Sequence, residues 1–173
     1  RANIIQDTNS FKRNLNLYVI SEDENGNLVN SSSSIKKNIK QWLNNYKMVN
    51  DTVDILDAVI VNIQVNFVAV IELNRNPNEV LNSCLQALKE KYSSKFNIGE
   101  PFYVSDIYKT LNNVDGVIDT STVTIERKTG LNYSQAQFSI QSNTSKDGRF
   151  IKVPQDTILE IKDLDLDIVG AVK

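Results

Sequence analysis

The stretch from Val59 to Arg127 constrains the fold most, because signals for several elements follow one another there in a definite order. Residues 61–67, Val-Asn-Ile-Gln-Val-Asn-Phe, alternate strictly between apolar and polar side chains and predict a strand with one buried face. Asn-Pro-Asn-Glu at 76–79 then opens a helix, and Gly-Glu-Pro at 99–101 separates it from a second, short helix. Val-Asp-Gly-Val at 114–117 turns the chain into another strand. No residue in this order suggests chemistry, so it indicates an assembly module.

The first strand of this stretch belongs to a β-rich region that is long for one strand. It extends from Val53 to Ile71, which predicts a bend or a short hairpin around Asp57 and Ala58. One face of the alternating part is apolar and is formed by Val59, Val61, Ile63, Val65 and Phe67. The other face carries the uncharged amides of Asn62, Gln64 and Asn66. These amides either face solvent or bind a partner by hydrogen bonds, and we favour solvent.

The helix expected over residues 33–46 follows a run of serines. One of the serines at 31–34 is expected to cap it by accepting a backbone N–H bond. Its apolar side chains fall at helical spacing on one face, at Ile35, Ile39, Trp42, Leu43 and Tyr46. Lys36, Lys37 and Lys40 lie off this stripe, so we expect them to be solvated rather than to bind nucleic acid.

The helix over residues 79–92 is the clearest element of the sequence. Asn76 is a good N-cap, and Pro77 occupies the favoured first position. Cys84 lies in the middle of the apolar stripe, so we interpret it as a small hydrophobic residue rather than a nucleophile. A third helix is expected to begin at Pro101.

Shorter signals complete the fold prediction. A tight turn is expected over residues 23–27, and strands over 15–20, 117–127, 135–141, 148–153 and 157–162. The chain then divides into a lead-in segment at 1–13, an α+β core at 14–130 and a C-terminal extension at 131–173. The expected fold class is α+β, with a mixed sheet, two to three helices packed on one face and an antiparallel C-terminal β extension.

Composition argues against most enzyme classes. The 173 residues contain no histidine and one cysteine, which removes the commonest general base and any internal disulfide or cysteine-rich metal site. The formal net charge of −2 gives no electrostatic footprint for nucleic acid. No apolar run is long enough to span a membrane, and the N-terminus has no signal-peptide pattern. We expect no enzymatic activity, no cofactor and no small-molecule substrate.

Two candidate sites were weighed and set aside. Asp163, Asp165 and Asp167 have the spacing of a calcium loop, but position 168, where an EF-hand needs glycine, is isoleucine. We interpret the three acids as an exposed strand face or a loop. Four Asn-x-Ser/Thr matches are expected by accident in a chain so rich in asparagine, and the six glycines are isolated rather than grouped in a phosphate loop. No catalytic, cofactor or metal residue is therefore assigned.

The order of elements resembles the C-terminal half of the baseplate J-like family, which includes wedge proteins of contractile phage tails. The resemblance covers roughly residues 13 to 165 and rests on the run 59–67, the helix 79–92 and the Val-Asp-Gly-Val turn at 114–117. It is strongest for the larger wedge proteins of T4-type phages. The chain begins at Arg1 and lacks the N-terminal region of a full wedge protein, so we interpret it as a fragment.

The resemblance implies a structural component of a phage tail baseplate wedge, located in the virion. Its partners would be copies of itself, as a homodimer or a ring, and neighbouring wedge subunits. An alternative is a small non-enzymatic binding module that recognises a peptide or ligand by strand addition. An enzyme using only carboxylates and hydroxyls is the least favoured. Candidate interface residues, chosen as aromatics in irregular or edge regions, are Tyr103, Tyr133 and Phe138.

Overall fold

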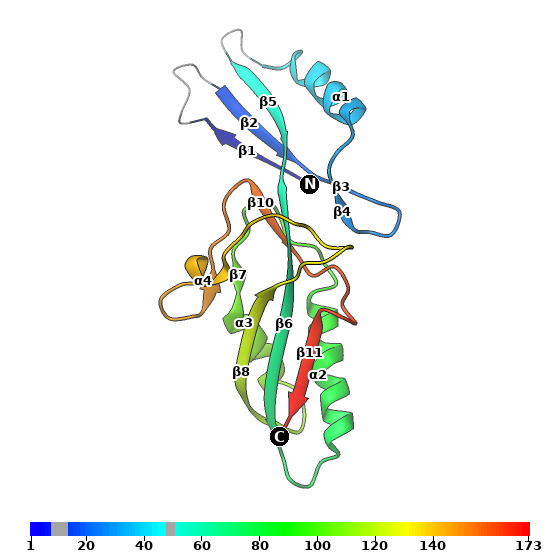
Figure 1. Cartoon of the computed structure of the whole chain (residues 1–173), viewed down its shortest axis with the longest axis vertical. Coiled ribbons are helices and arrows are strands. Elements are labelled where there is room, and N and C mark those ends of the chain that lie inside the picture. Colours follow the sequence, from blue (N-terminus) through cyan, green and yellow to red (C-terminus); the bar gives the residue numbers. More distant parts are fainter. Residues whose placement is uncertain (8–13, 48–50) are drawn as a thin grey trace.

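The computed structural model describes residues 1–7, 14–47 and 51–173, and shows an elongated molecule built along one long strand path (Figure 1). Strand β5 (Thr52–Asp57) continues through Ala58 into β6 (Val59–Ile71) without reversing direction. The first belongs to an upper sheet and the second to a lower sheet. The interruption predicted near Asp57 and Ala58 is therefore a bend between two sheets and not a hairpin.

The lower sheet is built around β6. Strand β8 (Val117–Arg127) pairs with it in antiparallel orientation, with register shifts that mark bulges near Ala69 and Ile71. Strands β10 (Thr157–Glu160) and β11 (Ile168–Val172) pair with it in parallel orientation. The sheet is mixed, as expected for the predicted α+β class, which the structure confirms.

The predicted antiparallel arrangement of the C-terminal extension is wrong for its two longest strands. Only β9 (Phe150–Ile151) is antiparallel, to the short strand β7 (Phe102–Tyr103). Thr157 pairs with Val59, and Ile168 pairs with Val65 further along the same strand. Both strands are parallel to β6 because the chain follows β6 in one direction, with a turn between them, instead of reversing.

Two helices cover one face of the lower sheet. These are α2 (Pro77–Lys91) and α3 (Val104–Asn112), which bury Val80, Cys84, Leu88, Val104, Ile107 and Leu111. The alternate residues of β6 from Val61 to Ile71 form the other half of this core. The cap predicted for α2 is present, because the side chain of Asn76 accepts a hydrogen bond from the N–H of Asn78 at 3.1 Å. Helix α3 begins later than predicted, because Phe102 and Tyr103 pair with β9.

The upper sheet contains β1 (Ala2–Gln6), β2 (Asn14–Val19) and β5, in that order. Helix α1 (Ser33–Leu43) lies beside β5 and is capped by Ser32, as the serine run predicted. It ends before Tyr46, where the apolar stripe ends. Residues 2–6 of the expected lead-in thus form a strand, and residues 8–13 of that segment lie outside the described residues.

The remaining elements are short. A hairpin of β3 (Ser21–Glu22) and β4 (Leu28–Val29) contains the predicted turn, in which Asp23 accepts the N–H groups of Asn25 and Asn27. These bonds lower the pKa of the Asp23 carboxyl, with those from Asn27 acting most strongly. The strand predicted over 135–141 is wrong, since a one-turn helix α4 (Ile140–Asn143) occupies part of it. No helix in the described part of the chain is long and apolar enough to cross a membrane.

Candidate assembly surfaces

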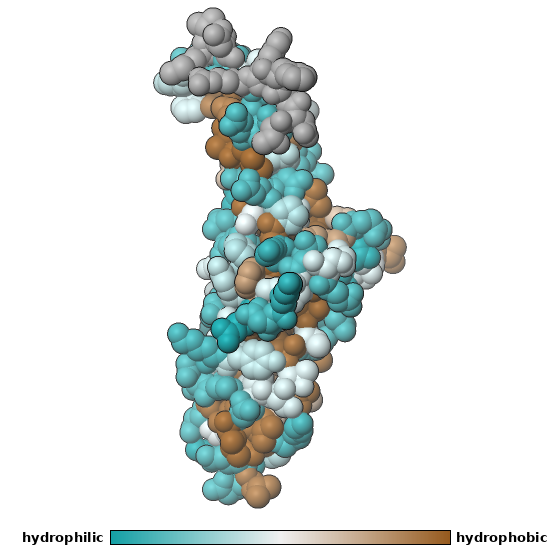
Figure 2. Space-filling view, turned by 90° about the vertical axis from the view of Figure 1, so that its left-hand side faces the viewer, coloured by the Kyte–Doolittle hydropathy of each residue, from teal (hydrophilic) through white to brown (hydrophobic). Residues whose placement is uncertain are grey.

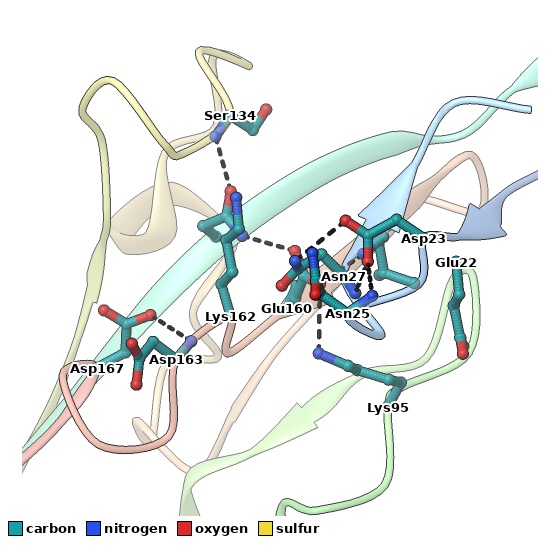
Figure 3. Close-up of polar contacts among 12 residues, drawn as sticks. Glu22, Asp23, Asn25, Asn27, Lys95, Ser134, Glu160, Lys162, Asp163 and Asp167 are labelled. Atoms are coloured by element: carbon teal, nitrogen blue, oxygen red, sulfur yellow. Dashed lines mark hydrogen bonds and ion pairs between the residues drawn. The ribbon is translucent and has the colours of Figure 1, made fainter.

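A buried carboxylate lies where the two sheets meet. Glu160, at the end of β10, is 2% exposed and accepts hydrogen bonds from the Leu28 N–H at 2.9 Å and the Asn62 side-chain amide at 2.8 Å. The Lys95 ammonium lies 3.4 Å from the same carboxylate (Figure 3). A buried charge is tolerated only when it is paired and hydrogen-bonded. Glu160 therefore connects the β3–β4 hairpin, β6 and the segment after α2.

The predicted solvent exposure of the amide face of β6 is wrong for Asn62. This side chain is 2% exposed, and its oxygen accepts a hydrogen bond from the Ser134 N–H at 2.7 Å (Figure 3). Gln64 and Asn66 are half-buried and bond to each other at 2.9 Å. The segment after β8 crosses this face and supplies the partner for Asn62, so this amide contributes to internal structure.

A second buried carboxylate holds the same crossing segment. Asp167 is fully buried and accepts a hydrogen bond from the Tyr133 hydroxyl at 2.9 Å, while the Lys128 ammonium lies 3.6 Å away. Burial, together with the bond and the charge of Asp167, raises the pKa of Tyr133 to about 12. The ammonium groups of Lys128 and Lys162 lie 5.8 and 5.9 Å from the Tyr133 ring centre, within range of a cation–π interaction.

The aspartates at 163–167 form a turn between β10 and β11. The Asp163 carboxylate accepts the N–H groups of Asp165 and Leu166. The Asp167 carboxylate accepts the Asp163 N–H at 3.1 Å (Figure 3). The expectation that these acids form an exposed strand face or a loop is thus correct as a loop, although Asp167 is buried. The described residues contain no group of three side chains placed to hold a metal ion.

An open groove of about 750 Å³ runs beside this junction. It is lined by residues of β4, the start of β6 and the crossing segment, among them Val29, Val59, Leu131, Tyr133 and Lys162. The polar groups of Asn62 and Glu160 that reach it already have intramolecular partners. The groove has both polar and apolar walls, and the buried Asp57 Oδ1 in its lining has no hydrogen-bond partner among the described residues. Cys84 lies elsewhere, fully buried on the core side of α2, and burial raises the pKa of its thiol.

The three predicted interface aromatics do not lie together. Tyr103 is 49% exposed at the β7 edge, with its ring 6.1 Å from that of Phe150. Tyr133 is half-buried in the contacts just described, and Phe138 packs against the main core. Of the three, Tyr103 is the one whose side chain is largely available to a partner.

Other apolar side chains are more exposed than Tyr103 and are not among the three predicted interface residues. Trp42 and Tyr46 are 60% and 70% exposed, and Leu73 and Leu131 are fully exposed at loop tips. Trp42 and Tyr46 belong to the apolar stripe predicted for the helix over residues 33–46. Periodicity could not show that Trp42 and Tyr46 stay exposed while Ile39 and Leu43 of the same stripe are half-buried.

No family model matches the chain, and no curated protein sequence matches it. The fold of the chain matches a chain in a solved structure. The matching chain belongs to the structure described as "Cryo-EM structure of the anti-feeding prophage (AFP) baseplate, 6-fold symmetrised". The match has a TM-score of 0.53 and 10% sequence identity, and it covers 87% of this chain. This chain spans only 29% of the length of its neighbour. At this identity the likeness shows a shared fold.

Proposed function

We propose that the chain is a structural component of a contractile-tail baseplate, where it joins copies of itself and neighbouring wedge subunits during tail assembly. It would reside in the tail baseplate of the assembled particle and act without catalysis. The wedge position and the J-like family relationship are part of this proposal.

The observation that carries the proposal is the fold match to a baseplate chain over 87% of the residues. The part of the sequence that resembles the J-like family forms β6, α2, α3 and β8 in the structure, in that order. The sequence pattern and the three-dimensional fold therefore both support a role in a contractile-tail baseplate.

The chemistry of the buried polar groups supports a structural role. Glu160 and Asp167 are the buried carboxylates of the described chain, and each holds separate segments together by hydrogen bonds. An elongated shape with apolar side chains at several places suits a connector that meets more than one neighbour (Figure 2).

Deletion of the coding segment from its genome tests the proposal. We expect contractile particles to lack complete baseplates in electron micrographs, and expression of the wild-type segment in trans to restore them. Complete baseplates in the deletion strain would contradict the proposal, whatever the oligomeric state of the isolated chain.

One observation favours strand addition as a second mode of partner binding. Strand β11 pairs with β6 and with no other described strand, so the hydrogen-bonding groups of its second edge are not used by a strand, although α2 packs against β11. Lys173 bonds to Ala69 of β6, and in a parallel pair the alternate residues, such as Val172, direct their N–H groups outward. Val172→Pro removes one outward donor, and we expect it to weaken a partner that binds by strand addition and to leave other contacts intact.

A further inference from the structure

One face of the upper sheet gathers apolar side chains from all three of its strands. The register pairs Ile4 with Leu17, and Leu17 with Ile55, so these three residues lie in a row across the sheet. The same face carries Leu15 and Val53 in the next row. Ile4 is 54% exposed at the β1 end of its row. Figure 2, which looks at the β1 side, shows hydrophobic side chains on the surface of this upper part.

Helix α1 covers only the β5 side of the sheet. Ile39 and Leu43 are half-buried, and Lys36 forms an ion pair with Asp57 of β5. Ile35, Trp42 and Tyr46 remain exposed on one flank of the helix, with the Trp42 and Tyr46 ring centres 4.6 Å apart.

The direction of that flank follows from helix geometry. Lys37 and Lys40, on the opposite flank, line a hollow together with Lys36 and with Asn16, Asp54, Ile55 and Leu56 of the sheet. Of these strand residues, Asn16, Asp54 and Leu56 direct their side chains to the other face of the sheet. Because 3.6 residues make one turn, Trp42 lies on the side of the helix away from these lysines. Trp42 and Ile35 therefore extend the apolar face that contains Ile4, Leu17 and Ile55.

The upper unit has almost no core of its own. No residue of β1, β5 or α1 is buried, and in β2 only Val19 is. The main core of the chain contains no residue of these elements. A three-stranded sheet needs a covered hydrophobic face for stability. The upper sheet and α1 together supply an apolar face but no layer that covers it.

We propose that a second copy of this chain covers this face, which we call the upper apolar face and define by Ile4, Leu15, Leu17, Val53, Ile55, Ile35, Trp42 and Tyr46. The inference rests on the proposed function, which requires copies to be joined, and it names the surface that joins them. The paired strand residues on this face include one charged side chain, Asp57, which Lys36 already pairs. Two copies related by a two-fold axis can therefore meet there without unpaired like charges.

The exposed apolar side chains of this face can form the centre of such a contact. A buried aromatic side chain contributes 150–250 Å², so the exposed fractions of Trp42 and Tyr46 together offer on the order of 200 Å². Ile4, Ile35 and the half-exposed strand residues add to this. A standard interface buries about 800 Å² per partner, and the apolar part supplies its centre.

Light scattering after size exclusion, over a hundredfold range of concentration, tests the proposal. We expect the wild-type mass to rise from 19.5 kDa to twice that value. The double variant Ile4→Glu/Trp42→Glu should remain monomeric with an unchanged circular dichroism spectrum, because both side chains are exposed. Leu73→Glu and Leu131→Glu change fully exposed apolar residues outside the face and should dimerise as the wild type does.

Thiol labelling gives a second readout that does not depend on a disruptive charge. The one native thiol, Cys84, is fully buried, so a new cysteine at Ile4→Cys is the reactive one in the folded protein. We expect its labelling rate to fall as concentration rises and the dimer forms. The matched variant Leu131→Cys should label at the same rate throughout.

The possible outcomes separate a failure of the upper apolar face as the contact surface from a failure of the proposed baseplate role. A wild type that dimerises together with a double variant that also dimerises would overturn the upper apolar face and leave the joining of copies intact. A wild type that stays monomeric, with Ile4→Cys labelling unchanged by concentration, would overturn the second copy as occupant. The baseplate role itself would then still be decided by the deletion experiment, in which this chain meets its other partners.

Discussion

The ring of Phe67 occupies the space that a β-carbon at position 170 would fill, because such an atom would lie 2.2 Å from the Phe67 Cζ. Phe67 and Gly170 are register partners in β6 and β11. The glycine is required here by close packing and not by its backbone, since its φ is not positive. It lets the last strand approach the core strand beneath α2.

Gly170→Ala should therefore destabilise the protein. We expect a loss of about 1–3 kcal/mol in the free energy of unfolding, because the added methyl overpacks a closed site. Urea denaturation followed by circular dichroism measures it. The same substitution in a Phe67→Leu background should cost less, since the ring is then gone. Equal costs in the two backgrounds would show that the Phe67 contact is not the cause.

Removal of the Glu160 carboxylate should have a larger effect. Glu160→Ala leaves the Leu28 N–H and the Asn62 amide buried without their acceptor. We expect a loss of about 3 kcal/mol in the free energy of unfolding. Glu126→Ala, on the exposed side of β8, is the control and should change stability by less than about 0.5 kcal/mol. A similar small change for both variants would refute the structural role of the Glu160 cluster.

The difference between Asn62 and its sequence neighbours shows where sequence reasoning ends. Alternation along residues 61–67 correctly predicted the buried apolar face from Val61 to Phe67, although Val59, assigned to the same face, is 39% exposed. The length of the β-rich region predicted a bend or a hairpin before it, and the structure has the bend. It could not predict that Asn62 is buried, because its partners Ser134 and Glu160 are 72 and 98 residues away in the chain. Strand β11 was missed for a similar reason, since its pairing with β6 depends on a glycine that only the tertiary packing against Phe67 explains.

The helix α1 illustrates a second limit. Its cap and its apolar stripe were readable from residues 31–46, because both are local features. Which part of the stripe is buried depends on what lies opposite, and the sheet beside it is only three strands wide. Trp42 and Tyr46, which are largely exposed in the structure, were therefore predicted to pack inside the protein rather than to form an interface.

Cys84 should be unreactive in the native protein. Its side chain is fully buried, and this burial raises the pKa of its thiol. Little thiolate therefore forms at neutral pH. We expect no reaction with a thiol-specific disulfide reagent under native conditions and one equivalent per chain in denaturant. Rapid reaction of the folded protein would show that α2 opens readily or is packed differently.

Tyr133 should make stability depend on alkaline pH. Its folded-state pKa of about 12 lies above the ordinary value for tyrosine of about 10. The protonated phenol thus contributes stability that is fully present below pH ~10 and is lost as the pH rises toward ~12. The fall in unfolding free energy across this window should be smaller in Tyr133→Phe than in the wild type. Parallel curves for the two proteins would contradict the Tyr133–Asp167 bond.

The most direct test of the baseplate assignment is the copy number of this chain in purified particles. Contractile tails from the organism that encodes it can be analysed by quantitative mass spectrometry, followed by cryo-electron microscopy of the baseplate. The baseplate with the matching fold has six-fold symmetry, so we expect a copy number that is a multiple of six and density for this fold in the baseplate. Absence of its peptides from intact, purified tails would contradict the account.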